Sequence, residues 1–244
     1  MSGIKSKSIA CILLLIWTVH VSSSVGAETN HHVSEKQTIN VGLIIFPPFI
    51  QQEENDKCYG IAVDDLTLIF PADKYNVNIH CASPSRIYRN FNSGLIDITI
   101  NAKSTTSLQS DVIYSEQPYK ILEMALYFRD VVKPFKISAI KSYDYHGMRE
   151  QLESQGNVFT EFSNTKEAIA VFLRGGCDAI LSYQLPFEHY LTESSKNRGF
   201  GSLNITFKKE SLISVRTYFA LNRKNKRANE LVKTIDDYFI SLSK

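Results

Sequence analysis

A run of small polar side chains follows a short apolar segment near the middle of the chain. Residues 95–100 read LIDITI, typical of a buried strand, and residues 101–119 read NAKSTTSLQSDVIYSEQPY. Hydroxyl and amide groups dominate the second stretch, and such groups at a turn can hydrogen-bond a small polar molecule. Ordinary turn capping is the alternative role. We therefore single out three candidate binding residues: Asn101, Ser104 and Thr105.

Familiar catalytic signatures are absent from the sequence. There is no G-x-S-x-G, no H-E-x-x-H, no phosphate-binding loop and no C-x-x-C pair. Each of these patterns places a nucleophile, a metal or a phosphate at a defined turn or helix. The formal net charge is +2 and no basic run stands out, which gives no support for nucleic acid as a partner. We expect no metal and no cofactor.

The first 27 residues have the layout of a secretory signal peptide. Lys5 and Lys7 precede an apolar run over residues 9–21, and small residues precede a cleavage point after Ala27. The apolar run is short for a membrane span of ~20 residues, so a membrane anchor is the less favoured alternative. We expect an exported, periplasmic protein that begins at Glu28, with residues 28–37 as a flexible leader.

Export allows the cysteines beyond the leader to be oxidised. A Cys58–Cys81 bridge would stabilise the fold by roughly 3 kcal/mol in the chain-entropy model. Cys177 would then be the odd cysteine, buried in a strand. We treat Cys58 and Cys81 as a candidate disulfide.

Strand and helix signals alternate along the remaining chain. Strands are expected at 39–45, 76–81, 95–100, 135–140, 157–162 and 177–182, and helices at 61–70, 84–94, 145–155, 164–176 and 226–242. This alternation favours βαβ units and an α/β fold with a largely parallel sheet. Two further apolar segments, 122–129 and 212–221, suggest a double linker between two lobes. The predicted bounds are 38–125 with 219–244 for lobe 1, and 126–218 for lobe 2. On periodicity alone, a single sheet instead of two lobes is an alternative.

Five motifs, taken in order, resemble the extracellular solute-binding proteins of family 3, the amino-acid type. They are FPPF at 46–49, YGIAVDDL at 59–66, SGLIDITINAKSTTS at 93–107, YSEQPY at 114–119 and RGGCDAILSY at 174–183. The resemblance covers essentially the chain beyond the leader. It implies the type 2 periplasmic-binding fold, in which two α/β lobes with mixed, mostly parallel sheets are joined by a double-strand hinge and close on a ligand.

The resemblance also implies residues in the cleft between the lobes. Phe46 stands where family members offer an aromatic face to the ligand, and Ser142 and Tyr143 match the ligand turn of the second lobe. Tyr183 stands where the family tends to have a carboxylate for the ligand's ammonium group. Core packing is the alternative role for Phe46 and Tyr183.

The family's arginine for the ligand carboxylate has no counterpart here. The matching position is Gln109 or Leu108, depending on the direction of counting, and neither is cationic. Lys103 could substitute, with a solvated lysine at a turn as the alternative. Asp144 places a carboxylate near the start of the second lobe's first helix, where the family often binds an anion. The predicted ligand is therefore a small polar molecule other than a standard α-amino acid.

Three functions follow from this resemblance. The leading one is a monomeric, non-enzymatic periplasmic receptor that delivers its ligand to an ABC-type membrane importer or reports it to a sensor. A dehydratase-type enzyme on the same scaffold is an alternative, with Asp144 or Glu116 as the acid. An accessory protein that has lost ligand binding is the third. Packing of Phe46, Tyr143 and Tyr183 on one another in the cleft would favour this last function.

Overall fold

The structure, a computed structural model, describes residues 36–108, 111–143, 145–196 and 206–242. The predicted signal peptide, the predicted leader up to Glu35, Gln109 and Asp144 lie outside these residues. Residues 36–244 group into one compact unit. No helix in the described ranges combines the length and the apolar character that a membrane span requires.

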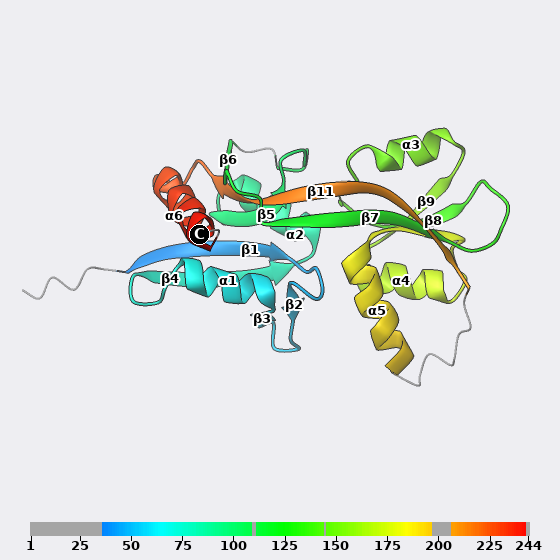
Figure 1. The fold of residues 1–244 in the computed structure, drawn as a ribbon, viewed down its shortest axis with the longest axis horizontal. Coiled ribbons are helices and arrows are strands. Elements are labelled where there is room, and N and C mark those ends of the chain that lie inside the picture. Colours follow the sequence, from blue (N-terminus) through cyan, green and yellow to red (C-terminus); the bar gives the residue numbers. More distant parts are fainter. Residues whose placement is uncertain (1–35, 109–110, 144, 197–205, 243–244) are drawn as a thin grey trace, which may run out of the picture. The chain divides into compact units, whose positions relative to one another are not determined.

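A mixed sheet runs through the described residues (Figure 1). Its strands are β1 (Gln37–Ile44), β4 (Tyr75–Ala82), β5 (Ile98–Ala102), β6 (Val112–Tyr114), β7 (Lys120–Phe128), β8 (Lys136–Ile140), β9 (Val158–Phe162), β10 (Ala179–Tyr183) and β11 (Lys208–Asn222). β1 is parallel to β4 and β5, and β8 is parallel to β9 and β10. The two parallel groups reproduce the predicted βαβ pattern.

The long strands β7 and β11 join the two parallel groups. They pair antiparallel with each other over most of β7, while β11 also pairs with β5 and β7 also pairs with β10. Both strands run from one group to the other in Figure 1. They contain the two apolar segments that were expected to cross between lobes. A separate ribbon is formed by β2 (Gln51–Gln52) and β3 (Cys58–Tyr59).

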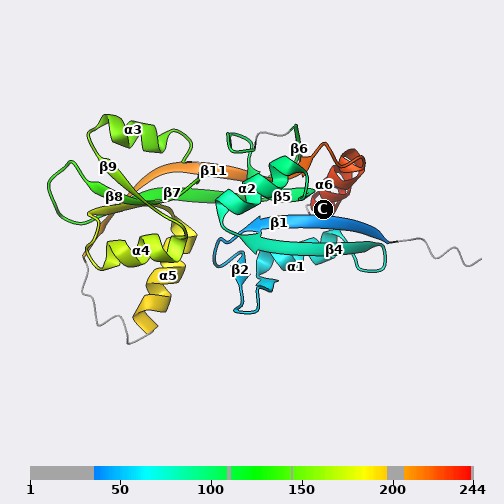
Figure 2. The ribbon, with the colours of Figure 1, turned by 180° about the vertical axis from the view of Figure 1, so that it is seen from behind.

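Helices cover both faces of the sheet. They are α1 (Ile61–Ile69), α2 (Pro84–Ser93), α3 (Met148–Ser154), α4 (Thr165–Leu173), α5 (Gln184–Lys196) and α6 (Ala228–Leu242). α1 and α6 lie on one face of the first parallel group and α2 lies on the other (Figures 1 and 2). α4 and α5 pack against strands of the second group. The predicted α/β fold class is confirmed, and α5 is a helix that the sequence patterns did not predict.

In each parallel group, an aspartate that directly precedes one strand is hydrogen-bonded to the backbone of the neighbouring strand. Asp97 accepts a hydrogen bond from the Asn40 backbone N–H at 2.8 Å, and its own N–H donates to the Asn40 carbonyl at 2.8 Å. Asp178 does the same with the N–H and carbonyl of Lys136, again at 2.8 Å each. These aspartates belong to two of the five motifs that supported the resemblance, and their carboxylates bind backbone groups.

Local sequence signals explain where the elements stop. Gly94 ends α2 with φ 86°, in the left-handed region where glycine pays no steric penalty. The Asn164 side chain accepts from the Glu167 N–H at 2.9 Å and begins α4, as its capping-box pattern predicts. A Cys58–Cys81 disulfide joins β3 to β4, and Cys177 is a buried free thiol.

Candidate functional site

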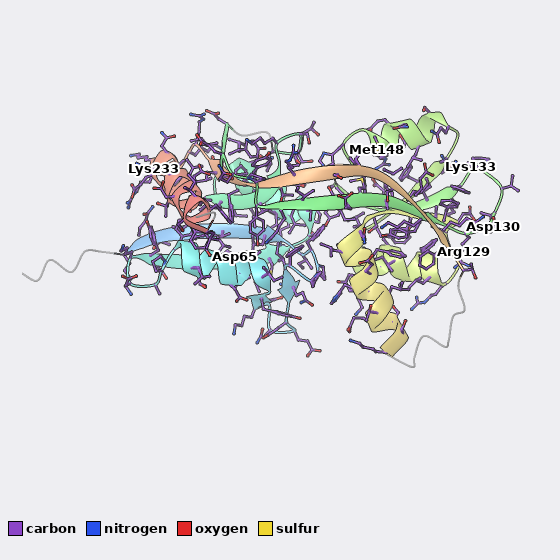
Figure 3. All side chains as sticks on the ribbon, viewed as in Figure 1. Asp65, Arg129, Asp130, Lys133, Met148 and Lys233 are labelled. Atoms are coloured by element: carbon purple, nitrogen blue, oxygen red, sulfur yellow. A yellow bond between two sulfur atoms is a disulfide. The ribbon has the colours of Figure 1, made fainter. Side chains whose placement is uncertain are left out.

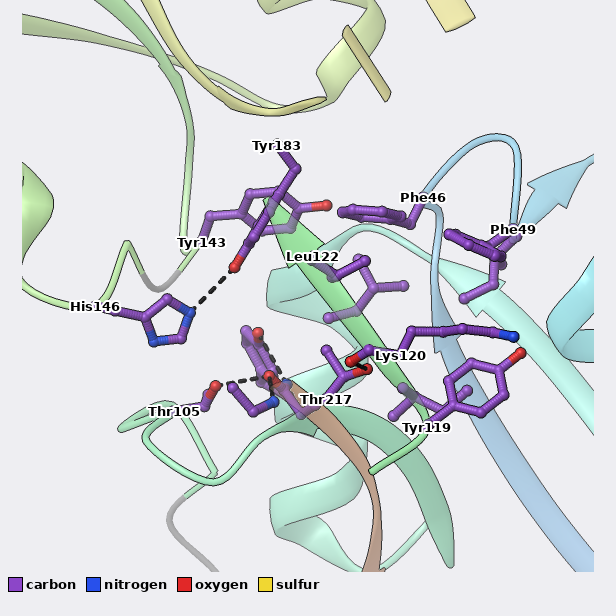
Figure 4. A pocket seen from close by; sticks show the side chains of 16 residues that line it. Phe46, Phe49, Thr105, Tyr119, Lys120, Leu122, Tyr143, His146, Tyr183 and Thr217 are labelled. Carbon is purple, nitrogen blue, oxygen red and sulfur yellow. Dashed lines mark hydrogen bonds between the residues drawn. The ribbon is translucent and has the colours of Figure 1, made fainter. Parts of the chain in front are cut away.

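A hollow with a cavity volume of ≈ 80 Å³ lies between the two parallel groups (Figure 4). Most of its lining is apolar or aromatic. The lining residues are Ile44, Phe46, Phe49, Ile50, Tyr88, Ile100, Asn101, Ala102, Thr105, Tyr119, Lys120, Leu122, Tyr143, His146, Tyr183 and Thr217. No carboxylate occurs among these lining residues. A cavity of about 150 Å³ holds benzene, so the hollow must widen before it can accept a body of that size.

The loop after β1 supplies the aromatic wall on the side of the first group. Phe46 and Ile50 exchange backbone hydrogen bonds of 2.9 and 3.0 Å, which closes a tight loop between them. This loop carries Phe46 and Phe49 to the hollow (Figure 4). The FPPF motif therefore builds a wall of the hollow.

Aromatic rings from both groups meet at this wall. The Phe46 and Tyr183 rings pack edge to face with centroids 5.3 Å apart, and the Tyr143 and Tyr183 rings do so at 6.1 Å. Such pairs contribute about 0.5–1.5 kcal/mol each beyond their burial. Burial is also the main cause that raises the pKa of Tyr143 well above its usual value. These three rings fill part of the space that a ligand would need.

The end of β5 carries a closed hydrogen-bond network. The Thr105 hydroxyl donates to Asn101 Oδ1 at 2.6 Å, and the Ala102 N–H donates to the same oxygen at 2.9 Å. Asn101 Nδ2 donates to the Tyr88 hydroxyl at 3.1 Å. This network orders the turn after β5, so turn capping accounts for the Asn101 oxygen.

Hydroxyl groups and a histidine bridge the hollow from one parallel group to the other. Ser104 Oγ and His146 Nδ1 are 2.9 Å apart, and His146 Nε2 lies 3.0 Å from the Tyr183 hydroxyl (Figure 4). Because both hydroxyls can donate or accept, the bridge is satisfied in either histidine tautomer. A second bridge is the hydrogen bond of 3.1 Å from Ser85 Oγ to Ser142 Oγ. Together these contacts hold the hollow closed.

A lysine lies at the opposite end of the hollow. Lys120 Nζ stands 5.0 Å from the centroid of the Tyr119 ring and 5.8 Å from that of the Phe49 ring. Both distances suit a cation–π contact. Tyr119 is itself held by a hydrogen bond of 2.8 Å from its hydroxyl to Asp65, a residue of α1 (Figure 3).

Five of the eight predicted ligand residues line the hollow, and three do not. Those that line it are Phe46, Asn101, Thr105, Tyr143 and Tyr183. Lys103 is exposed with Nζ 4.1 Å from the Tyr218 ring centroid, while Ser104 and Ser142 make the bridges already described. The interpretation of Lys103 as a substitute for the family's arginine therefore gains no support from its position.

The other candidate positions lie away from the hollow. Leu108 is buried in a cluster with Ile87 and Phe91, so its side chain is a core contact. Glu116, one of the two acids considered for a dehydratase, is exposed and outside the lining. The other positions considered, Gln109 and Asp144, are outside the described residues.

Sequence patterns missed the histidine and the lysine of the site. The backbone of His146 has φ 52°, a conformation in which histidine is enriched among non-glycine residues. Lys120 directly follows the YSEQPY motif, and this adjacency was the one signal available. Neither position belongs to the motifs that carried the resemblance.

Comparisons with known proteins show the fold. No protein-family model matches the chain, and no curated protein matches it. Among solved structures, an ancestral arginine-binding protein bound to glutamine is 19% identical with TM-score 0.68, over 85% of this chain and 92% of that chain. A histidine kinase sensor domain with similarity to periplasmic binding proteins is 18% identical with TM-score 0.68, over 85% and 91%.

A third similar structure is the substrate-binding protein of an ABC uptake transporter from Streptococcus pneumoniae with bound histidine. It is 16% identical with TM-score 0.67, over 85% of this chain and 87% of that chain. At such identities the likeness establishes the architecture, which is the type 2 periplasmic-binding-protein fold. The mixed sheet and the two joined parallel groups agree with it.

Proposed function

We propose that this chain is an exported solute-binding protein that closes on a small organic ligand for import or sensing. The ligand has a largely apolar body and is not a standard α-amino acid. Its site is the hollow between the two parallel groups, which act as lobes 1 and 2 with the bounds predicted from the sequence. The single observation that carries the proposal is a mostly apolar hollow, walled by both groups, whose described lining contains no carboxylate.

Charge is the reason for excluding α-amino acids. An ammonium group taken out of water needs a carboxylate or several acceptors, because burying an unpaired charge is costly. Tyr183 lines the hollow at the position where the resemblance implies a carboxylate, and its hydroxyl is already hydrogen-bonded to His146. The apolar walls instead favour a body that gains from leaving water. This makes the ligand less polar than the sequence suggested.

A thermal-unfolding screen tests the proposal. The purified chain is heated with a library that includes the standard amino acids and small neutral or acidic molecules with apolar bodies. A true ligand at a hundredfold excess over Kd stabilises the protein by about 2.7 kcal/mol through mass action. We expect shifts from members of the second class and none from arginine, histidine or glutamine. Shifts only from amino acids would overturn the ligand class.

An accessory protein without a ligand is the second candidate function. It is favoured by the packing of Phe46, Tyr143 and Tyr183 on one another, which leaves ≈ 80 Å³ of free volume. Tyr183→Ala separates the two candidates, because it removes the ring at the centre of this packing. In a receptor the variant alters the affinity for the ligand found in the screen. Absence of any shift in both wild type and Tyr183→Ala would favour the accessory protein.

A further inference from the structure

We infer that Lys120 anchors an anionic group of the ligand. The ligand class is then small monoanions with an apolar body, such as monocarboxylates. This inference rests on the proposed function, because it concerns the same hollow. It differs from the sequence expectation, in which Lys103 was the candidate cation. The geometry of the two lysines decides between them.

The backbone of Lys120 is fixed where β7 begins. Its carbonyl accepts a hydrogen bond from the Thr217 hydroxyl at 3.1 Å, and Lys120 pairs with Thr217 across β7 and β11. The side chain then extends between Phe49 and Tyr119 (Figure 4). The ammonium group therefore lies beside two aromatic rings, at one end of the apolar hollow.

Among the described residues, no acid forms an ion pair with Lys120. The ion pairs recorded in these ranges involve other residues. The nearby Asp65 carboxylate instead accepts the hydrogen bond from Tyr119. A cation beside apolar walls attracts an anion more strongly than one in open water, because the effective dielectric constant is lower. The site therefore selects for negative charge at this end.

Lys103 differs from Lys120 in its position. It is exposed, it stands over the Tyr218 ring, and it is not among the residues that line the hollow. A ligand in the hollow would have Lys120 in its wall and Lys103 outside it. Lys103 therefore provides a control that removes the same charge and the same ammonium group without touching the site.

The two ends of the hollow differ in their chemical groups. Lys120 and Tyr119 form one end, and Thr105 and His146 form the other (Figure 4). Leu122, from β7, lies among the apolar side chains between them. An anionic head at Lys120 with an apolar body along these side chains would match this order. A zwitterion would match only through its anionic group, at Lys120, because the described lining contains no carboxylate for its ammonium group.

Paired probes test the inference by isothermal titration calorimetry. Isobutyrate and benzoate are titrated against their amides, isobutyramide and benzamide, into wild type, Lys120→Met, Lys120→Arg and Lys103→Met. We expect wild type to prefer each acid to its amide. Lys120→Met should weaken acid binding roughly ten- to a hundredfold, the range for hydrogen bonds to charged groups, and leave amide binding unchanged. Lys120→Arg should retain the preference, and Lys103→Met should equal wild type.

Each outcome bears on a different claim. Equal binding of acids and amides by wild type, or an acid preference that survives in Lys120→Met, overturns the inference and leaves the receptor proposal intact. Failure of all four probes also overturns the inference, while the receptor proposal is then decided by the thermal screen alone. Comparison of the Met and Arg variants, whose melting curves are recorded first, separates charge from any loss of folding.

Discussion

At the scale of single residues, His146 connects side chains at one end of the hollow. His146 is hydrogen-bonded to Ser104, which follows β5 in the first group, and to Tyr183, which ends β10 in the same group as His146. Only the contact with Ser104 crosses between the groups, and a net contribution of about 0.5–1.5 kcal/mol per hydrogen bond sets the size of its bias toward the closed state. That bias exists without any ligand, so a ligand must compete with the protein's own contacts.

Replacing His146 is expected to shift the protein toward an open state. Asparagine is the suitable substitute, because it tolerates the left-handed backbone at this position and is too short to span both partners. We expect His146→Asn to enlarge the radius of gyration in small-angle X-ray scattering and to speed ligand association. His80→Ala, on the exposed edge of β4, is the matched control. Identical scattering from His146→Asn and wild type would rule out the bridge as a latch.

The buried tyrosines define a prediction for alkaline pH. Burial is the main cause that raises the pKa of the Tyr119, Tyr127, Tyr143 and Tyr145 hydroxyls above the usual ~10. Their contribution to stability is complete below pH ~10, the pKa in the unfolded chain, and is lost as the pH rises toward the higher folded values. Unfolding should therefore become easier above pH ~10.

Ultraviolet absorbance near the phenolate band measures this directly. The sequence has 12 tyrosines, and we expect those four to stay protonated until the protein unfolds. Titration in urea should release them together with the rest. If all tyrosines ionised in one step near pH ~10 while circular dichroism still reported a folded protein, the buried environment described for them would be wrong.

At the scale of elements, the two aspartates that bind a neighbouring strand are both expected to stabilise the fold, to different extents. Asp97→Ala removes the acceptor of the Asn40 N–H in β1, and Asp178→Ala removes that of the Lys136 N–H in β8. Leaving such a group unsatisfied costs about 1–3 kcal/mol when it is buried. We expect a loss toward the upper end for Asp97, which also accepts from the Asn225 side chain at 2.9 Å, and a smaller loss for Asp178.

Urea unfolding curves measure both losses. Asp111→Ala is a control, because its ion pair with Arg223 lies at the exposed surface. Exposed pairs contribute at most about 1 kcal/mol. If Asp97→Ala lowered the free energy of unfolding no more than Asp111→Ala does, the Asp97 hydrogen bonds would not stabilise the strand.

The apolar patterns predicted most elements, and the misses have physical causes. β1, α2 and α4 combine a strong apolar repeat with a clear stop or cap, and the structure places them within a few residues of the expected bounds. α5 was missed because only Pro186 and Phe187 are buried along it, which leaves no apolar stripe. β2, β3 and β6 are too short to show a strand period.

The candidate site was predictable only in part. Phe46, Asn101 and Tyr183 were found because motifs place them at strand ends, where ligands meet α/β sheets. Lys120 and His146 were not predicted, because their place in the lining of the hollow depends on which segments meet in space. That meeting is set by the long pairing of β7 with β11, which no local pattern reports.

At the scale of the whole described unit, two parallel groups share one small hollow and close it with their own side chains. Hydrogen bonds and packed rings connect the two groups directly at this hollow. Ligand binding then requires these bonds to open and the hollow to widen. The net binding free energy of any ligand is the free energy of its own contacts less that of the protein contacts that it replaces.

Protein-detected NMR with the strongest stabiliser from the thermal screen locates the bound ligand on the protein. If a small ligand with an apolar body occupies the hollow between the parallel groups, we expect saturable shifts centred on Phe46, Leu122, Thr217 and Tyr183. We expect none in the surface groove between α4 and α5 that includes Lys166 and His189. Saturable shifts confined to that groove, or no saturable shifts at all, would show that the hollow is not the binding site.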